Sequence, residues 1–112
     1  MRRATIVIAC LALSLITGCS KEHAVEEYVN VEMDASGFHP DTVWAKKGKA
    51  ITITFKRTED VPCGNGVLIA AESLRKDLPL DTPVRISLLP GRKGKLHFAC
   101  PQNAFGGDIV VQ

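Results

Sequence analysis

The sequence contains little of what enzyme active sites are usually made of. Its 112 residues include only three histidines and two methionines, and no two of its four cysteines form a Cys-x-x-Cys motif. Without that motif the usual dithiol redox chemistry is not expected, and a nucleophilic cysteine would need an adjacent base. Internal repeats and low-complexity tracts are absent as well. The sequence therefore predicts a protein that is not an enzyme.

The sequence also lacks an apolar run at its start that is long enough to cross a membrane. The run 4–16 has 13 residues, whereas a spanning helix needs about 20. Two arginines precede this run, and a threonine and a glycine follow it. A positive start, a short apolar stretch and small residues at its end are typical of a secretory signal peptide. We therefore expect residues 1–18 to be removed on export.

The end of this segment, Leu15-Ile16-Thr17-Gly18-Cys19, resembles the bacterial lipobox. The resemblance implies that Cys19 receives the lipid and becomes the first mature residue, and Ser20 resembles the pattern for sorting to the outer membrane. Each acyl methylene buried in the bilayer contributes about 0.8 kcal/mol to membrane binding. We predict an exported bacterial lipoprotein on the outer membrane, facing the periplasm. Residues 19–26 would be the lipidated cysteine and a polar tether.

An excess of charge of one sign is absent from the predicted mature chain. Two of the 14 Lys+Arg residues leave with the signal peptide, so that 12 cations remain against 12 Asp+Glu. Two basic clusters, 46–49 and 91–95, lie at glycine turns without interleaved aromatics. Nucleic-acid binding is therefore not expected, and the simplest role of these clusters is to keep the turns solvated. The predicted partner is the membrane, through the lipid on Cys19.

Alternating segments dominate the rest of the chain. The segments with apolar side chains at every second position are 27–34, 51–56, 84–88 and 95–100. This period is typical of half-buried strands, and Gly and Pro turns separate the segments. About seven short strands predict an all-β domain over residues 27–112, an antiparallel Greek-key β-sandwich. Met33 is expected in its core, and Trp44 is expected to pack rather than to bind a substrate.

The order of the motifs in this domain resembles a known family. Residues 29–60 contain a strand, Gly-Phe-x-Pro, Lys-x-Gly and then an alternating strand. The second half contains "PCGNGVLI", "LP" and Gly-x-x-x-Phe-x-Cys-Pro, followed by a glycine turn into "DIVV". Together these motifs resemble the cupredoxin-like domains of bacterial exported proteins, of the EfeO or plastocyanin type, over residues 27–112. The resemblance implies a cupredoxin-like sandwich with a copper site at one end.

The same resemblance implies which residues form the site. It places Cys63 and Cys100 side by side as copper ligands, with Gln102 as a weak axial ligand. Thiolates are soft donors that favour Cu(I), and only the deprotonated thiol binds metal. Related domains often end in Cys-x-Met-x-Met, but Gln102 and Ala104 stand at the methionine positions here, and no histidine follows Cys100. A conventional blue-copper site, which has two imidazole ligands, is therefore not expected.

The histidines of the domain are not expected to complete such a site. His97 falls on the strand face opposite Cys100, so we expect it to point to solvent. His39 occupies the variable position of the Gly-Phe-x-Pro motif, and His23 lies in the tether.

Two interpretations of the cysteine pair stay open. In the first, Cys63 and Cys100 bind or buffer copper as Cu(I), with a copper-handling or redox protein as partner. In the second they form a disulfide, which is ordinary outside the cytoplasm, and the metal-free domain is a scaffold or protein-interaction module. Closing a loop with 36 intervening residues would stabilise the domain by about 4 kcal/mol. A form in which copper binds only the reduced pair is compatible with both interpretations.

Overall fold

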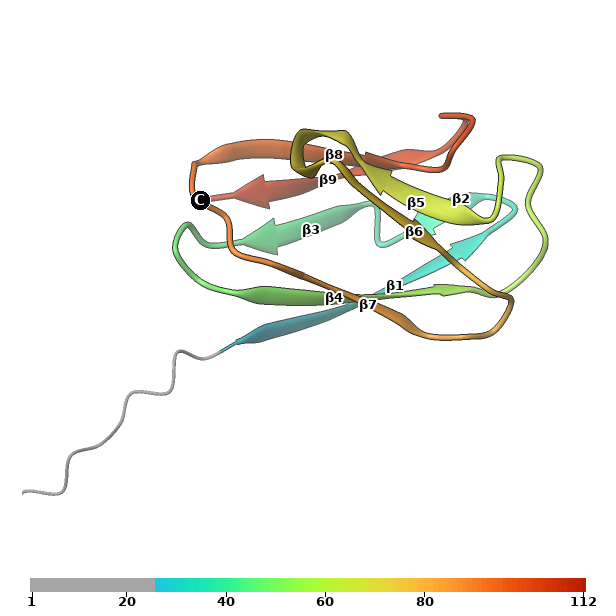
Figure 1. Cartoon of the computed structure of the whole chain (residues 1–112), viewed down its shortest axis with the longest axis horizontal. Helices are drawn as coiled ribbons and strands as arrows, with labels where there is room; N and C mark the ends of the chain where they lie inside the picture. Colours follow the sequence, from blue (N-terminus) through green and yellow to red (C-terminus); the bar gives the residue numbers. More distant parts are fainter. Residues whose placement is uncertain (1–25) are drawn as a thin grey trace, which may run out of the picture.

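The computed structural model describes residues 26–112, which form two packed β-sheets (Figure 1). The predicted signal peptide, the predicted lipid site at Cys19 and most of the predicted tether lie outside the described residues. Within residues 26–112, no helix is long and apolar enough to span a bilayer.

Nine strands lie in the described part of the chain. The elements are β1 (Glu27–Asp34), β2 (Gly37–His39), β3 (Thr42–Ala45), β4 (Ile51–Arg57), β5 (Gly66–Ile69), the 3-10 turn η1 (Ala70–Glu72), β6 (Leu74–Asp77), β7 (Val84–Leu88), β8 (Gly94–Ala99) and β9 (Gly106–Val111). One sheet has the order β2-β1-β4-β7, and the other has the order β3-β9-β8-β5-β6. The prediction of an all-β sandwich is confirmed.

The expectation that the sheets are purely antiparallel was wrong at two strand pairs. β1 pairs with β4 in parallel and β3 pairs with β9 in parallel, whereas the other strand pairs of the described chain are antiparallel. The cause is that β2 and β3 both run opposite to β1 but belong to different sheets, because the chain crosses from one sheet to the other at Pro40 and Asp41. After β3, the strand β4 runs in the direction of β1 and lies beside it. Because this segment of the chain forms two short strands, β2 and β3, instead of one, it also helps to explain why there are nine strands instead of about seven.

Three phenylalanines from both sheets form the centre of the core. Phe98 of β8 lies edge-on against Phe38 of β2 and Phe55 of β4, with ring centroids 5.1 and 5.5 Å apart. Edge-to-face pairs are favourable beyond the burial of their area, and each of these rings is at most 3% exposed. Met33 is fully buried beside them, as predicted. The core therefore holds β8 in place at Phe98, which is only two residues before Cys100.

Trp44 does not pack in the core, contrary to the sequence-based expectation. Its side chain is 58% exposed because it lies on the edge strand β3, between the inward-facing residues Val43 and Ala45. The strand period therefore directs the indole to the outer face of the sheet.

The sandwich has two ends that differ in what the chain places there. The basal end is defined by residues 26–27, 46–50 and 89–95, where β1, β4 and β8 begin; Figure 1 shows the C-terminus at this end as well. The cysteine end is opposite, because Cys63 follows the end of β4 and Cys100 follows the end of β8. A strand of seven residues such as β4 is about 20 Å long. The two ends are therefore separated by roughly the length of one strand.

Candidate metal centre at the cysteine end

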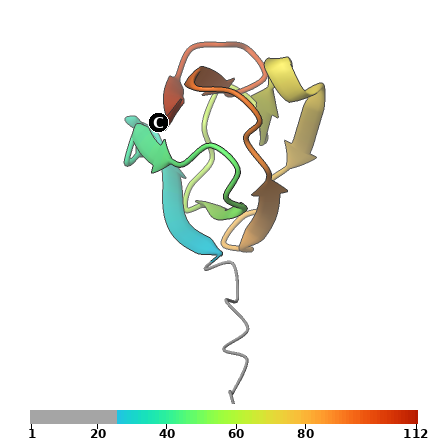
Figure 2. The same cartoon turned by 90° about the vertical axis from the view of Figure 1, so that its left-hand side faces the viewer.

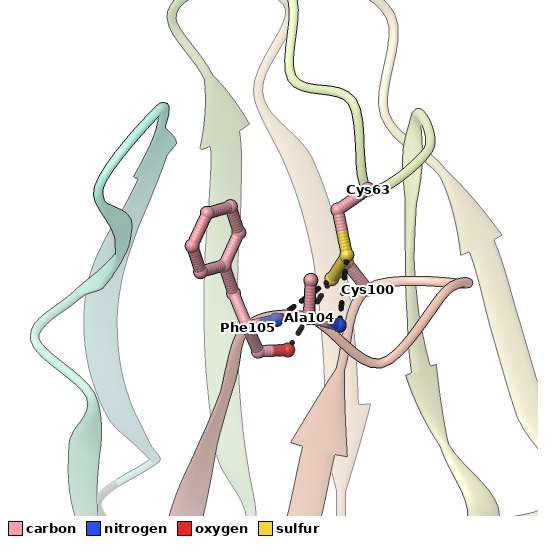
Figure 3. Close-up of a disulfide and its surroundings, with 4 residues drawn as sticks. All are labelled: Cys63, Cys100, Ala104 and Phe105. Carbon is pink, nitrogen blue, oxygen red and sulfur yellow. Dashed lines mark hydrogen bonds between the residues drawn. A yellow bond between two sulfur atoms is a disulfide. The ribbon is translucent and has the colours of Figure 1, made fainter.

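Two loops bring the domain's cysteines together at the cysteine end. Cys63 lies in the loop that passes from β4 in one sheet to β5 in the other, and Cys100 directly follows β8. In the structure the two residues form a disulfide, with their Cα atoms 5.7 Å apart (Figure 3). This Cα separation is usual for a disulfide. Both residues are buried, with Cys63 1% and Cys100 0% exposed.

The loop after Cys100 supplies a backbone N–H to each sulfur. The N–H of Ala104 donates to Cys63 Sγ and the N–H of Phe105 donates to Cys100 Sγ, both at 3.2 Å (Figure 3). The turn is closed by hydrogen bonds from Cys100 N–H to the Phe105 carbonyl and from Asn103 N–H to the Cys100 carbonyl. A hydrogen bond to a charged group is stronger than one to its neutral form. These amides would therefore stabilise a thiolate at either sulfur more than a thiol.

The loop that carries Cys63 is tied to the loop after Cys100. The N–H of Gln102 donates to the Cys63 carbonyl at 3.0 Å. Gly64 has φ +103°, and a Cβ at this position would lie 3.0 Å from the ring of Pro101. Only glycine adopts such a backbone without strain, so the glycine after Cys63 permits the close contact of the two loops.

A buried cation, Arg57, holds the other side of the Cys63 loop. The residue is 5% exposed. Its side chain donates from Nε to the Leu78 carbonyl and from Nη1 to the Asp60 carboxylate, both at 2.7 Å. The N–H of Leu78 in turn donates to the Asn65 carbonyl at 2.7 Å. Arg57 is therefore linked to the segments on both sides of Cys63, and we expect these links to hold the cysteine in position.

Sequence reasoning missed Arg57, although the sequence contains its signal. Residues Ile51, Ile53 and Phe55 alternate inward along β4, and Arg57 continues the same period of two. An arginine on the inward face of a strand has to find partners for its charge and its N–H groups. The pattern therefore indicated a buried, paired arginine next to the Cys63 loop.

The other residues singled out from the sequence lie further from the sulfurs. The backbone of Gln102 reaches Cys63, but the residue is exposed. The metal-ligand roles of Cys63, Cys100 and Gln102 stay predictions. Among the residues that the structure describes, no three His, Cys, Asp or Glu side chains gather as a metal-binding group.

The two histidines of the domain have carboxylate partners instead. His97 is exposed, as expected from its strand face, and its Nδ1 lies 3.1 Å from Asp108 Oδ1. His39 Nε2 lies 3.1 Å from Asp34 Oδ1 and 2.8 Å from Ser36 Oγ. The Ser36 hydroxyl and the Ser36 N–H, which both donate to this carboxylate, lower the pKa of Asp34, and His39 lowers it further. Each imidazole therefore lies within hydrogen-bonding distance of a carboxylate on the neighbouring strand.

The fold and this pair of loops define a class of protein. Two mixed β-sheets, with one cysteine in the mid-chain loop and another after the penultimate strand, have the architecture of a cupredoxin. The chain belongs to the cupredoxin-like domain family, whose family model matches residues 5–111. None of the curated proteins compared with the chain matches it.

Solved structures that resemble the chain include copper-binding domains. The metal-binding domain of the Cu(I)-exporting P-type ATPase CopA from Streptococcus pneumoniae D39, determined with Cu(I), is 23% identical; the match covers 78% of this chain and 86% of that chain, with a TM-score of 0.73. A copper-binding protein determined in its apo form is 24% identical; the match covers 78% of this chain and 88% of that protein's chain, with a TM-score of 0.71. At these identities the likeness shows the fold.

The same fold also occurs within a larger copper enzyme. The copper nitrite reductase of Nitrosomonas europaea is 12% identical; the match covers 78% of this chain but 41% of that chain, with a TM-score of 0.58. Membership of the fold therefore does not decide between binding and catalysis. That the chain is not an enzyme stays a prediction from its sequence.

Proposed function

We propose that the reduced Cys63/Cys100 pair binds Cu(I) and that the disulfide is the metal-free, oxidised form of the same site. The observation that carries this proposal is the pair of buried sulfurs, each with a backbone N–H at 3.2 Å. Sulfur donors without imidazoles suit Cu(I) rather than Cu(II). The solved metal-binding domain of the Cu(I)-exporting ATPase supports copper as the metal, since it has this fold and was determined with Cu(I).

The proposed conversion of the disulfide is a two-electron reduction. A dithiol of a redox partner protein gives two electrons and two protons to the Cys63–Cys100 bond, and the partner's own sulfurs become a disulfide. Cu(I) then binds as the thiols of Cys63 and Cys100 lose their protons. Gln102, whose backbone is held at Cys63, is the weak additional ligand in this proposal. The chain's own contribution is to keep both sulfurs together and to stabilise their anionic form.

The proposed setting is a lipoprotein of the outer membrane that faces the periplasm, with the lipid on Cys19 and an exported cupredoxin-like domain of the EfeO or plastocyanin type. The lipobox-like segment 15–19 supports this setting. Disulfides form and persist in that compartment, which suits a site whose metal-free form is the disulfide.

A second function is favoured by one specific observation, the disulfide itself. Both cysteines are almost completely buried and bridged, and a permanent bridge would leave no sulfur donor for copper. The domain would then be a metal-free scaffold or protein-interaction module that the cross-link stabilises.

A Cu(I) titration of the soluble protein separates the two functions. Residues 20–112 contain every strand and the whole core described above, and they leave out Cys19, which could otherwise bind metal. We expect the reduced protein to take one Cu(I) from a coloured chelator under anaerobic conditions, and the oxidised protein to take none. The double variant Cys63→Ser/Cys100→Ser should also take none. Equal uptake by the reduced protein and the double variant would contradict the proposal.

The state of the cysteines after export is the companion measurement. Intact mass and thiol counting of protein isolated from the periplasm give the oxidised fraction directly. A bridge that resists dithiol reductants in the folded protein would favour the scaffold function. Two thiols that become unreactive on addition of one Cu(I) would favour the metal site.

A further inference from the structure

The two basic clusters of the sequence meet at the basal end of the sandwich. The N–H of Gly48 donates to the carbonyl of Pro90 at 2.8 Å, which joins the turn after β3 to the turn before β8. Figure 2 looks onto this end and shows both turns (green and orange). The exposed cations of the two turns and of the start of β8, here called the basal patch, are Lys46, Lys47, Lys49, Arg92, Lys93 and Lys95. Two clusters about forty residues apart in sequence therefore form one surface.

Exposed apolar side chains adjoin the basal patch. Trp44 is 58% exposed and Leu89 is 70% exposed. Trp44 is opposite Val110 in the β3–β9 register, and Val110 is opposite Lys95 in the β8–β9 register. The indole and the Lys95 side chain therefore lie in one row on the outer face of this sheet. An exposed indole beside lysines is typical of a protein surface that contacts the membrane–water interface.

The patch retains its positive charge when the neighbouring carboxylates are counted. Glu26 and Glu27 lie at the start of β1, and Glu26 accepts hydrogen bonds from Tyr28 and Thr52. Glu72 of η1 lines a hollow together with Arg92. Six cations thus face three carboxylate side chains. The patch has an excess of positive charge although the predicted mature chain has none.

The opposite end of the molecule has the opposite charge. The carboxylates that adjoin the ends of β1, β4 and β6 at the cysteine end are Asp34, Glu59, Asp60, Asp77 and Asp81. Three cations lie among these five carboxylates: Lys56, Lys76 and the buried Arg57, which is paired with Asp60. The domain is therefore bipolar along its strands, with the basic end where the chain enters β1 and the acidic end around the cysteines.

We propose that the basal patch binds the anionic headgroups of a phospholipid membrane. The chain enters β1 at this end, because the N–H of Glu27 donates to the carbonyl of Ala50 in the turn between β3 and β4. A domain held to a bilayer through its N-terminal segment would present this end to the lipid surface. Surface cations are attracted to anionic lipids over about one Debye length. Repulsion of the acidic end would hold the cysteine end away from the bilayer, on the side that faces soluble partners.

Vesicle binding of the unlipidated protein tests this proposal. Residues 20–112 lack Cys19, so no lipid anchor contributes, and Trp44 is the only tryptophan of the chain. We expect its fluorescence to shift to shorter wavelength with vesicles that contain about 30% phosphatidylglycerol in phosphatidylcholine, and not with phosphatidylcholine alone. Salt at about 1 M should reverse the shift because it screens the headgroup charge. The readout does not depend on copper, so it stands apart from the proposed metal site.

Two variants with the same change in charge locate the contact. Lys46→Gln/Lys47→Gln/Lys49→Gln removes three cations of the basal patch, and we expect its vesicle affinity to fall at least about tenfold. Arg75→Gln/Lys76→Gln/Arg85→Gln removes three exposed cations of β6 and β7, outside the patch. Its affinity should stay within about threefold of the parent protein. Circular dichroism of both variants checks that each is folded.

The outcomes that overturn the proposal are equally definite. Absence of a shift with the phosphatidylglycerol vesicles at about 50 mM salt, where screening is weak, overturns it. An equal loss of affinity in the two triple variants overturns it as well, because the contact would then follow net charge rather than the patch. Tighter binding of the same patch to duplex DNA or to polyglutamate than to the vesicles would reassign it to a polyanionic macromolecule.

Discussion

Gly64 is the residue at which the Cys63 loop turns against Pro101, and its substitution tests how tightly the two loops are joined. Gly64→Ala would place a Cβ 3.0 Å from the proline ring in a backbone with φ +103°. We expect a loss of about 1–2 kcal/mol in the free energy of unfolding, because alanine is strained at positive φ. Urea unfolding measures this loss.

Gly91→Ala is the matched control for that experiment. Gly91 has no neighbouring atom within 4 Å of the position that a Cβ would take. Its substitution should change the free energy of unfolding by no more than about 0.5 kcal/mol, as is usual for surface positions. Equal losses of unfolding free energy in the two variants would show that Pro101 does not restrict which residue can occupy position 64.

Asp34 provides a pH-dependent test at the scale of one residue. The Ser36 hydroxyl and N–H, which donate to its carboxylate, lower the pKa of Asp34 below its ordinary value of 3.8. Because the folded pKa is below the unfolded one, Asp34 contributes stability above about pH 4, and this is lost as the pH falls through the folded pKa. NMR titration should show that the pKa of Asp34 rises toward 3.8 in Ser36→Ala. An unchanged pKa in this variant would contradict the assigned cause.

At the scale of elements, Arg57 connects the end of β4 to the two segments that flank Cys63. Arg57→Met would leave the buried Leu78 carbonyl without its donor, and an unsatisfied buried group costs about 1–3 kcal/mol. We expect the free energy of unfolding to fall by about 2 kcal/mol. A second readout belongs to the site: the disulfide should form less readily in a glutathione buffer, with an equilibrium constant at least about tenfold lower.

The control for Arg57→Met is Arg75→Met. The Arg75 side chain is 65% exposed, and its contact with Asp77 is 4.0 Å long, so its loss should cost less than about 0.5 kcal/mol. Arg57→Met with normal disulfide formation but reduced stability would mean that Arg57 supports the fold without positioning Cys63.

The strands of this domain were largely predictable from the sequence, and their arrangement was less so. β1, β4, β7 and β8 follow from alternation, because one face of each meets the core. The change of sheet between β2 and β3 could not be predicted, because three- and four-residue strands have too few positions to show a period. The parallel pairing of β1 with β4 depends on that change, so a local pattern does not contain it.

The candidate site was predictable to the same extent. The family resemblance placed Cys63 and Cys100 at the ends of two loops, and the structure brings these residues together there. The amides of Ala104 and Phe105 that approach the sulfurs belong to the backbone, and side-chain identity says nothing about them. The exposure of Trp44 escaped prediction because a strand of four residues is too short to show from the sequence which of its faces is buried.

At the scale of the whole molecule, the disulfide joins the loop between the two sheets to the end of β8, across a sequence separation of 37 residues. Reduction should lower the free energy of unfolding by about 4 kcal/mol, because the unfolded chain without the cross-link has more conformational entropy. Urea unfolding of the oxidised and the reduced protein measures this difference. If the reduced protein binds Cu(I), the metal should restore part of it in proportion to its concentration. A difference near zero would show that the loops stay in place without the bond.

The parallel pair β1–β4 has a mechanical consequence for a domain that is held by its N-terminal segment. Seven residue pairs join the two strands, from Glu27 opposite Ile51 to Met33 opposite Arg57. A pull at the start of β1 acts along the strand, whereas the hydrogen bonds of the ladder run across it. Such a force shears all the hydrogen bonds of the ladder at the same time, instead of breaking them one after another from one end. If the proposed lipid on Cys19 anchors the domain, drag from a partner at the cysteine end would be resisted by the whole length of β1.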